Sequence, residues 1–251
     1  MTKPRIMLAV ATALALLPAG SALAAPTKNI VLVHGAFADG SGWKPVADIL
    51  RKDGYSVTVA QPPLTSLEDD VAATNRVLDR LNGPAILVGH SYGGAIITEA
   101  GNNPHVVGLV YVAAMAPDAG EALGALLQSK PAATTGIGPS KDGFLFLDPA
   151  VFDADFAGDL PKPLADFMAL SQMPVAGKAF GTPITDPAWK SKPSYAIVAT
   201  EDRMINPDLE RSMYQRAKAH VTELKGSHVI FISQPAAVAK VIEAAAKDGT
   251  S

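Results

Sequence analysis

The 251-residue chain contains no cysteine. A disulfide framework, a thiol nucleophile and a metal site built on cysteine are therefore excluded. An excess of positive charge is also missing: the formal net charge is −3. No cluster of Lys and Arg forms the basic patch that nucleic-acid binding requires. Because 48% of the residues are hydrophobic, the chain can bury a sizeable core, and its stability must come from that core.

Three short motifs are also missing. The sequence has no HExxH, no GxxxxGK[ST], and no GxGxxG after its first apolar run. These patterns hold a catalytic zinc, a nucleotide phosphate and a dinucleotide, respectively. We therefore expect no metal, no cofactor and no nucleic acid among the ligands of this protein.

The first residues have the pattern of an export signal. Lys3 and Arg5 supply positive charge, residues 6–17 are apolar apart from one threonine, and residues 22–24 form a small-residue cleavage site. A membrane anchor is the alternative, but the apolar stretch is shorter than the roughly 20 residues that span a bilayer. We expect residues 1–24 to be a signal peptide, a mature chain without a membrane span, and a periplasmic or extracellular location.

After this segment, short aliphatic runs alternate with longer amphipathic stretches. This alternation predicts an α/β fold, in which helices cover both faces of a mostly parallel central sheet. Strands are expected at residues 29–34, 56–60, 85–89, 106–113, 195–200 and 221–224. Helices are expected at residues 43–53, 66–81, 92–102, 207–219 and 235–247, the second of them capped by Ser66.

The alternation stops between residues 117 and 192, where proline, glycine and aromatic residues are frequent. A long segment of this kind between two strands indicates a mobile cap over a site. We therefore divide the mature chain into a first core part (25–116), a cap insertion (117–192) and a second core part (193–251). A second small domain with its own core is the alternative.

The sequence Gly89-His90-Ser91-Tyr92-Gly93 matches GxSxG, and it lies between a predicted strand and a predicted helix. In this context the serine sits on a tight turn at the start of a helix, where its hydroxyl is exposed and the helix dipole favours negative charge. The placement of the motif makes Ser91 the candidate nucleophile.

A serine hydroxyl needs a neighbouring base, and histidine suits that role near neutral pH. Of the five histidines, His228 follows the last predicted strand in a short loop, at the sheet edge where α/β proteins place their sites. His34 and His90 are expected to be structural, and His105 and His220 are expected at the edges. His228 is therefore the candidate base.

The acid that orients this base should follow an earlier strand at the same edge. Asp202 follows the strand at 195–200, and the order Ser91, Asp202, His228 is the order found in α/β-hydrolases. Glu201 and Asp118 are the alternative acids, and a solvated loop charge is the alternative for each of them.

Backbone N–H groups must stabilise the oxyanion that forms during acyl transfer. Tyr92 follows the nucleophile and supplies one N–H group, and Ala36, after the first strand, is expected to supply the other, with Phe37 as the alternate. An apolar substrate pocket is expected to be lined by Phe37, Tyr92, Phe146 and Phe167.

Five stretches together resemble a known family: His34-Gly35-Ala36, Gly42-Trp43, residues 89–94, Ala199-Thr200-Glu201-Asp202 and Gly226-Ser227-His228. They are similar to the α/β-hydrolase branch that contains plant methyl esterases of the salicylate type and hydroxynitrile lyases. The resemblance implies the α/β-hydrolase fold, a triad at the positions of Ser91, Asp202 and His228, and an oxyanion hole at Ala36 and Tyr92. The chain has Tyr92 where those esterases commonly have leucine, and its cap differs.

The expected activity is hydrolysis of small hydrophobic or aryl carboxylic esters through an acyl-enzyme. Lactone hydrolysis, cofactor-free perhydrolysis and ligand binding without catalysis are the alternatives. The lyases of the resembling branch carry a lysine after the histidine, where this chain has Val229, and a threonine at the position of Gly35, so the resemblance favours an esterase. The expected partner is a small-molecule ester, and a homodimer is left open.

Overall fold

The computed structural model describes residues 27–248. The predicted signal peptide and its cleavage site therefore lie outside the described residues. None of the helices between residues 27 and 248 has the length and apolar character needed to cross a bilayer.

A six-stranded sheet forms the centre of the molecule, with the strand order β2-β1-β3-β4-β8-β9. Each neighbouring pair in it is parallel. The strands are β1 (Asn29–Val33), β2 (Ser56–Ala60), β3 (Ala85–Ser91), β4 (Val106–Ala114), β8 (Ser194–Ala199) and β9 (His220–Leu224). Their positions agree with the predicted strands to within two residues at every end.

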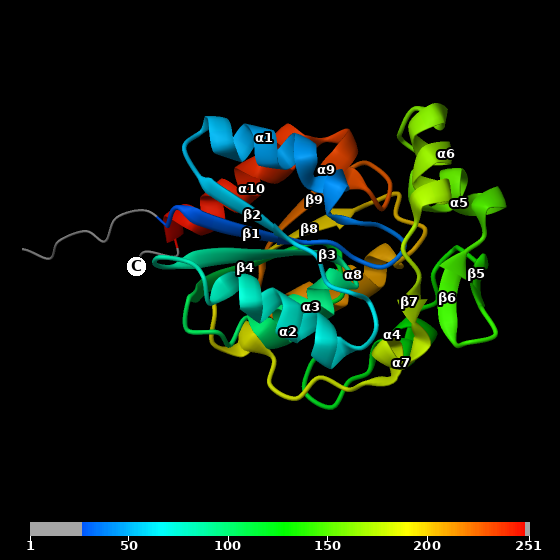
Figure 1. Ribbon diagram of the computed structural model, residues 1–251, viewed down its shortest axis with the longest axis horizontal. Coiled ribbons are helices and arrows are strands. Elements are labelled where there is room, and N and C mark those ends of the chain that lie inside the picture. Colours follow the sequence, from blue (N-terminus) through cyan, green and yellow to red (C-terminus); the bar gives the residue numbers. More distant parts are fainter. Residues whose placement is uncertain (1–26, 249–251) are drawn as a thin grey trace, which may run out of the picture.

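Helices cover both faces of this sheet, as the alternation of apolar runs predicted (Figure 1). The covering elements are η1 (Gly40–Trp43), α1 (Lys44–Lys52), α2 (Leu67–Leu78), α3 (Gly93–Ala100), α8 (Pro207–Arg216), α9 (Ile230–Ser233) and α10 (Pro235–Asp248). Helix α1 packs against α10 on one face, and α2 packs against α3 on the other. The Tyr111 ring of β4 contacts Tyr214 of α8, and its hydroxyl lies 3.0 Å from Thr98 Oγ1 of α3, so α8 shares the face of α3.

Local signals explain where several of these helices begin and end. The Ser66 side chain accepts the amide of Asp69, which caps α2 as predicted. Helix α8 was expected to reach residue 219 but ends at Arg216, because Lys218 has a φ of +53° and cannot continue a right-handed helix. The prediction also extended α2 to residue 81, three residues beyond its end at Leu78.

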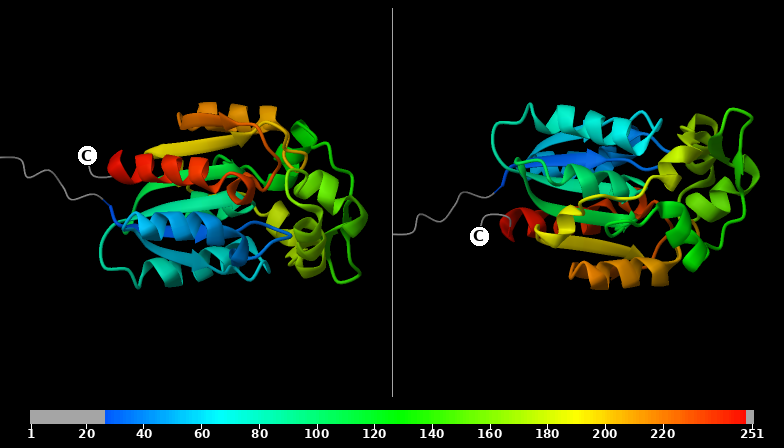
Figure 2. Two further views of the ribbon diagram at one scale, coloured as in Figure 1. Left: turned by 90° about the horizontal axis from the view of Figure 1, so that it is seen from above. Right: turned by 90° about the horizontal axis from the view of Figure 1, so that it is seen from below.

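Residues 117–192, which we call the cap segment, lie between β4 and β8 in the chain. The segment contains α4 (Leu123–Ser129), β5 (Ile137–Pro139), β6 (Phe144–Leu147), α5 (Pro149–Phe156), α6 (Lys162–Ser171), β7 (Val175–Ala176), α7 (Gly177–Gly181) and η2 (Ala188–Lys190). Most of it lies beyond the carboxyl ends of the central strands, on the right in Figure 1 and in both views of Figure 2. The sequence showed no strand pattern here, yet β5, β6 and β7 form a small antiparallel sheet.

Candidate active site

The nucleophile candidate lies at the sharp turn between β3 and α3. Ser91 has a φ of +55°, a strained value for a residue with a side chain, and this turn exposes its hydroxyl at the carboxyl edge of the sheet. Close packing requires the flanking glycines, because a Cβ on Gly89 would lie 2.5 Å from the Gly93 carbonyl oxygen, and one on Gly93 would lie 2.7 Å from that of His34. The motif therefore has the backbone geometry that its sequence predicted.

The structure brings the three triad candidates together in one chain of hydrogen bonds. His228 Nε2 lies 2.8 Å from Ser91 Oγ, and His228 Nδ1 lies 2.6 Å from Asp202 Oδ2. Because a carboxylate can only accept, Nδ1 carries the proton and Nε2 is left to accept the hydroxyl proton of Ser91. This arrangement lets His228 act as a base toward Ser91.

Asp202 is held in place by its own backbone neighbours. Its Oδ1 accepts the amide N–H groups of Met204 at 2.7 Å and Ile205 at 2.9 Å, while Oδ2 accepts His228. The side chain is buried. A buried carboxylate with both oxygens hydrogen-bonded keeps one orientation, and thereby fixes the imidazole ring as well.

The two alternative acids lie elsewhere. Glu201 forms an ion pair with Lys225 at 3.5 Å, and Asp118 forms one with Lys190 at 2.6 Å. Asp202 is therefore the carboxylate that contacts His228.

A second buried acid, which the sequence analysis missed, lies next to Asp202. Glu210 of α8 is fully buried, and neither of its oxygens has a hydrogen-bond partner within residues 27–248. Burial, together with the negative charge of Asp202, raises the pKa of Glu210 well above its usual value. The neutral form of Glu210, which adds no second charge beside Asp202, is therefore favoured.

His90 contacts the backbone of the candidate base, His228. Its Nε2 lies 3.0 Å from the carbonyl oxygen of His228, so the ring donates its proton there. Burial, and next the proximity of His228, lower the pKa of His90 well below its usual value, which keeps the ring neutral. His34 is buried too, so both histidines have the structural placement expected of them.

The backbone donors at the site distinguish Ala36 from Phe37. The Phe37 amide donates to the carbonyl oxygen of Met173 at 3.0 Å. Within the described chain no protein acceptor is recorded for the amides of Ala36 and Tyr92. Gly35 makes the close approach possible, because a Cβ there would lie 2.6 Å from that of Ser91. The amides of Ala36 and Tyr92 are thus available to bind an oxyanion.

The side chain of Tyr92 has a buried partner that the sequence analysis did not identify. The Tyr92 hydroxyl donates to Asp70 Oδ2 at 2.6 Å, and the amide of Leu64 donates to Asp70 Oδ1 at 2.7 Å. Burial, partly offset by these hydrogen bonds, raises the pKa of Asp70 to about 6. The ring of Tyr92 also stacks on Phe180 of the cap segment, with centroids 5.6 Å apart. Tyr92 therefore links the nucleophile turn to both α2 and the cap segment.

A small chamber of about 30 Å³ lies over Ser91. Its walls are apolar apart from Ser91 and the Tyr92 hydroxyl, and they consist of Ala36, Phe37, Ser91, Tyr92, Met115, Leu127, Ile137, Phe180, Met204 and Ile205. Phe37 and Tyr92 line it as predicted. Phe146 and Phe167, also predicted to line the pocket, do not line this chamber; both side chains are exposed, and Phe167 lies in the wall of a neighbouring groove.

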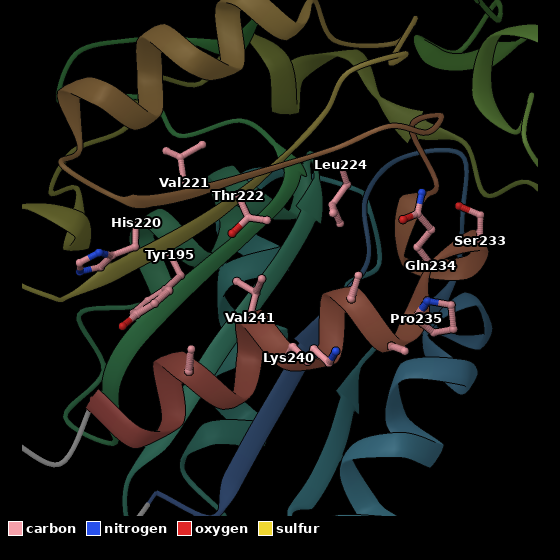
Figure 3. A pocket seen from close by; sticks show the side chains of 13 residues that line it. Tyr195, His220, Val221, Thr222, Leu224, Ser233, Gln234, Pro235, Lys240 and Val241 are labelled. Carbon is pink, nitrogen blue, oxygen red and sulfur yellow. The ribbon is translucent and has the colours of Figure 1, made fainter.

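Two further hollows lie outside the chamber. An apolar groove of about 270 Å³ between α6 and α9 has Phe167 in its wall and shares Phe37 with the chamber. A wider groove of about 750 Å³ runs between the edge strand β9 and α10, where Tyr195, Val221 and Val241 line it (Figure 3). The wider groove contains none of the triad candidates. Within residues 27–248, no three His, Asp or Glu side chains lie close enough together to hold a metal ion.

Comparison with known proteins gives consistent matches. Residues 30–241 match the model of the Alpha/beta hydrolase family. A carbendazim hydrolyzing esterase from Nocardioides sp. (strain SG-4G) is 38% identical over 114 residues, which cover 39% of this chain and 47% of that protein. A pyrethroid hydrolase from Sphingobium wenxiniae is 28% identical over 247 residues, covering 85% of this chain and 86% of that protein. The crystal structure of polyneuridine aldehyde esterase shares the fold, with a TM-score of 0.73 and 18% identity over 86% of this chain and 98% of that one.

Proposed function

The chain belongs to the alpha/beta hydrolase family, and from this membership and the geometry of its site we propose that it is a serine esterase. Ser91 is the nucleophile, His228 the general base and Asp202 the orienting acid. The observation that carries the proposal is the continuous hydrogen-bonded chain from Ser91 Oγ through the His228 ring to Asp202 Oδ2. The relatives include a carbendazim hydrolyzing esterase and a pyrethroid hydrolase, which supports the reaction class.

In the first half of the reaction, His228 Nε2 takes the proton of Ser91 Oγ as that oxygen attacks the ester carbonyl carbon. The carbonyl oxygen becomes an oxyanion, which accepts the N–H groups of Ala36 and Tyr92. Asp202 stabilises the imidazolium that forms. His228 then gives its proton to the leaving alkoxide, the carbon–oxygen bond to that alcohol breaks, and an acyl-Ser91 intermediate remains.

In the second half, water takes the place of the alcohol. His228 removes a proton from the water, the resulting hydroxide attacks the acyl carbon, and the bond to Ser91 Oγ breaks as His228 returns the proton to it. The products are a carboxylic acid and an alcohol, and no other reactant is consumed.

The substrates we propose are small hydrophobic or aryl esters. The chamber over Ser91 has apolar walls and no charged side chain, so a charged acyl group would lose its hydration there without gaining a partner. Its small volume favours a short acyl group. Export through residues 1–24 is part of the same proposal, and it would deliver the enzyme to esters outside the cytoplasm.

A fluorophosphonate probe tests the proposal directly. We expect stoichiometric labelling of the wild type at Ser91, no labelling of Ser91→Ala, and turnover on a panel of p-nitrophenyl, methyl and lactone esters. A folded wild type that is neither labelled nor active on any ester would contradict the proposal and favour a ligand-binding protein. Faster turnover of lactones than of open esters would replace the esterase with a lactonase on the same triad.

A further inference from the structure

One short stretch of the cap segment contacts both loops that carry the acid and the base. We call residues 155–159, at the end of α5 and in the turn after it, the clamp. Asp155 forms an ion pair with Arg203, the residue after Asp202. Asp159 accepts the amide of Ser227, the residue before His228. These loops follow different strands, β8 and β9, and the Glu201 amide already donates to the Gly226 carbonyl oxygen between them, so the clamp adds a second connection between two parts of the site.

On the base side, the Asp159 carboxylate collects three donors. It accepts the Ser227 amide at 3.0 Å and the Ser233 hydroxyl at 2.7 Å through Oδ2, and the Ser227 hydroxyl through Oδ1. Hydrogen bonds to a carboxylate are stronger than those between neutral groups. Because Ser227 directly precedes His228, these bonds fix the backbone from which the imidazole projects.

The His228 ring also contacts aromatic rings of both the core and the clamp. The Phe156 ring contacts it edge-on, with centroids 5.1 Å apart and an interplanar angle of 66°. On the core side His90 binds the His228 carbonyl oxygen at 3.0 Å. The clamp and β3 therefore both contact the base, and their rings, Phe156 and His90, also contact each other.

On the acid side, Asp155 is buried and accepts Arg203 Nε at 2.7 Å. Burial tends to raise the pKa of Asp155, but the hydrogen bonds from Arg203 and Thr134 outweigh it and leave the pKa below its usual value. Asp155 is thus ionised at neutral pH and holds a full ion pair. The carbonyl oxygen of Arg203 in turn accepts the Thr134 amide at 2.9 Å, a second contact from the cap segment to this loop.

We propose that Asp159 and Asp155 are positioning residues of the esterase site. The clamp keeps its contacts with both loops while substrate enters and product leaves. The inference rests on the proposed function. The contact between His228 Nδ1 and Asp202 Oδ2 joins the two loops, and displacing either loop by about 1 Å would weaken proton transfer strongly. The mobile part of the cap segment is then restricted to elements outside the clamp, such as α4, which lines the chamber through Leu127.

The test compares Asp159→Ala, which removes all three acceptor contacts, with Asp159→Asn, which keeps the shape of the side chain. Asp153→Asn is the matched control, because Asp153 lies in α5 just before the clamp and no hydrogen bond within residues 27–248 joins its side chain to either loop. Ser227→Ala removes the hydroxyl that donates to Asp159 Oδ1.

For Asp159→Ala we expect kcat to fall about 10- to 100-fold with KM changed less than about 3-fold, since the substrate chamber is untouched. The rate of fluorophosphonate labelling should fall by a similar factor. The acid limb of the pH profile of kcat/KM should move to lower pH, because the imidazolium loses part of its contact with the carboxylate. Asp159→Asn and Ser227→Ala should show smaller changes of the same kind, and Asp153→Asn none.

A lower melting temperature for Asp159→Ala with unchanged kcat, labelling rate and pH profile would overturn the inference and leave the clamp a purely structural contact. If Asp159→Ala does not fold, the same comparison is decided by Asp159→Asn and Ser227→Ala. These outcomes differ from failure of the proposed function, in which the wild type itself would be neither labelled nor active.

Discussion

The central sheet and the cap segment bury their apolar side chains to very different extents. In β1, β3, β4 and β8 nearly every side chain is buried. In the cap segment, Phe146, Leu164, Phe167 and Leu170 are exposed. All three triad candidates belong to the sheet and its loops, whereas the cap segment supplies walls of the chamber and the clamp. We therefore expect changes at the triad candidates of the sheet to abolish turnover. Changes in the cap segment should alter rate or selectivity by smaller factors.

The largest effect is expected for the triad. Ser91→Ala and His228→Ala should each lower kcat by roughly 10³ to 10⁶ without loss of folded structure, because residues that act as one unit fail together. Asp202→Asn should cost somewhat less. Steady-state kinetics on p-nitrophenyl acetate, with circular dichroism for folding, measure this.

Asp118→Asn is the matched control for the acid, since Asp118 pairs with Lys190 and should be dispensable. An inactive Asp118→Asn beside a nearly normal Asp202→Asn would mean that the acid is misassigned.

The next effect concerns stability and pH at Asp70. Its folded pKa of about 6 lies above the usual 3.8, so its protonation favours folding below pH about 4, and this contribution is lost as the pH rises through 6. Asparagine can accept the Leu64 amide and donate to the Tyr92 hydroxyl, so Asp70→Asn should keep both bonds and lose the pH dependence. Relative to the wild type it should gain roughly 1 to 3 kcal/mol between pH 4 and pH 8.

Urea unfolding of both proteins at several pH values measures this difference. A stability difference that stays constant across the range would show that Asp70 is ionised throughout.

A smaller effect is expected in the cap segment. Phe180 lines the chamber and stacks on Tyr92, so Phe180→Ala should change KM for aryl esters by about 3- to 10-fold, the value of one aromatic contact. Phe146 and Phe167 lie outside the chamber, so Phe146→Ala and Phe167→Ala should change KM by no more than about 2-fold. A larger change for Phe167→Ala than for Phe180→Ala would instead place part of the substrate in the groove beside Phe37.

The smallest effect on turnover is expected for Glu210→Gln. Because burial and the charge of Asp202 raise the pKa of Glu210 well above its usual value, a neutral amide of the same shape should leave kcat within about 2-fold. The raised pKa means that folding stability is lost as the pH rises toward it, so the variant should be more stable than the wild type at alkaline pH. Thermal unfolding at pH 7 and pH 9 tests this. A loss of activity as large as that of Asp202→Asn would assign Glu210 a part in the reaction.

The sequence predicted the central sheet well, and it placed the three triad candidates at one sheet edge, for one physical reason. Strands buried on both faces of a parallel sheet must be almost wholly apolar, and loops at their carboxyl ends converge on one edge. Ser91, Asp202 and His228 each follow such a strand, so their meeting follows from the topology. The family and the fold are confirmed by comparison, and the export signal and the domain boundaries stay predictions.

The supporting residues were not predictable in the same way. The role of Asp70 was not predictable, because no sequence pattern shows that its side chain points inward to Tyr92. Glu210 and Asp159 lie in segments whose orientation depends on tertiary packing. Phe146 and Phe167 were expected in the pocket as aromatic residues of the cap segment, but both side chains are exposed and neither lines the chamber over Ser91.

The distance along the chain between the members of the triad has a consequence for folding. Ser91 and His228 are 137 residues apart, and β4 and β8 separate their strands in the sheet. Contacts between residues so far apart in sequence form late, after local helices such as α1 and α2. During refolding, ester hydrolysis should therefore return only once β4 has paired with β8, the pairing that spans the longest stretch of chain in the central sheet. A chain that ends before β9 would carry the serine but no base, so activity reports the completed fold rather than its first compact stages.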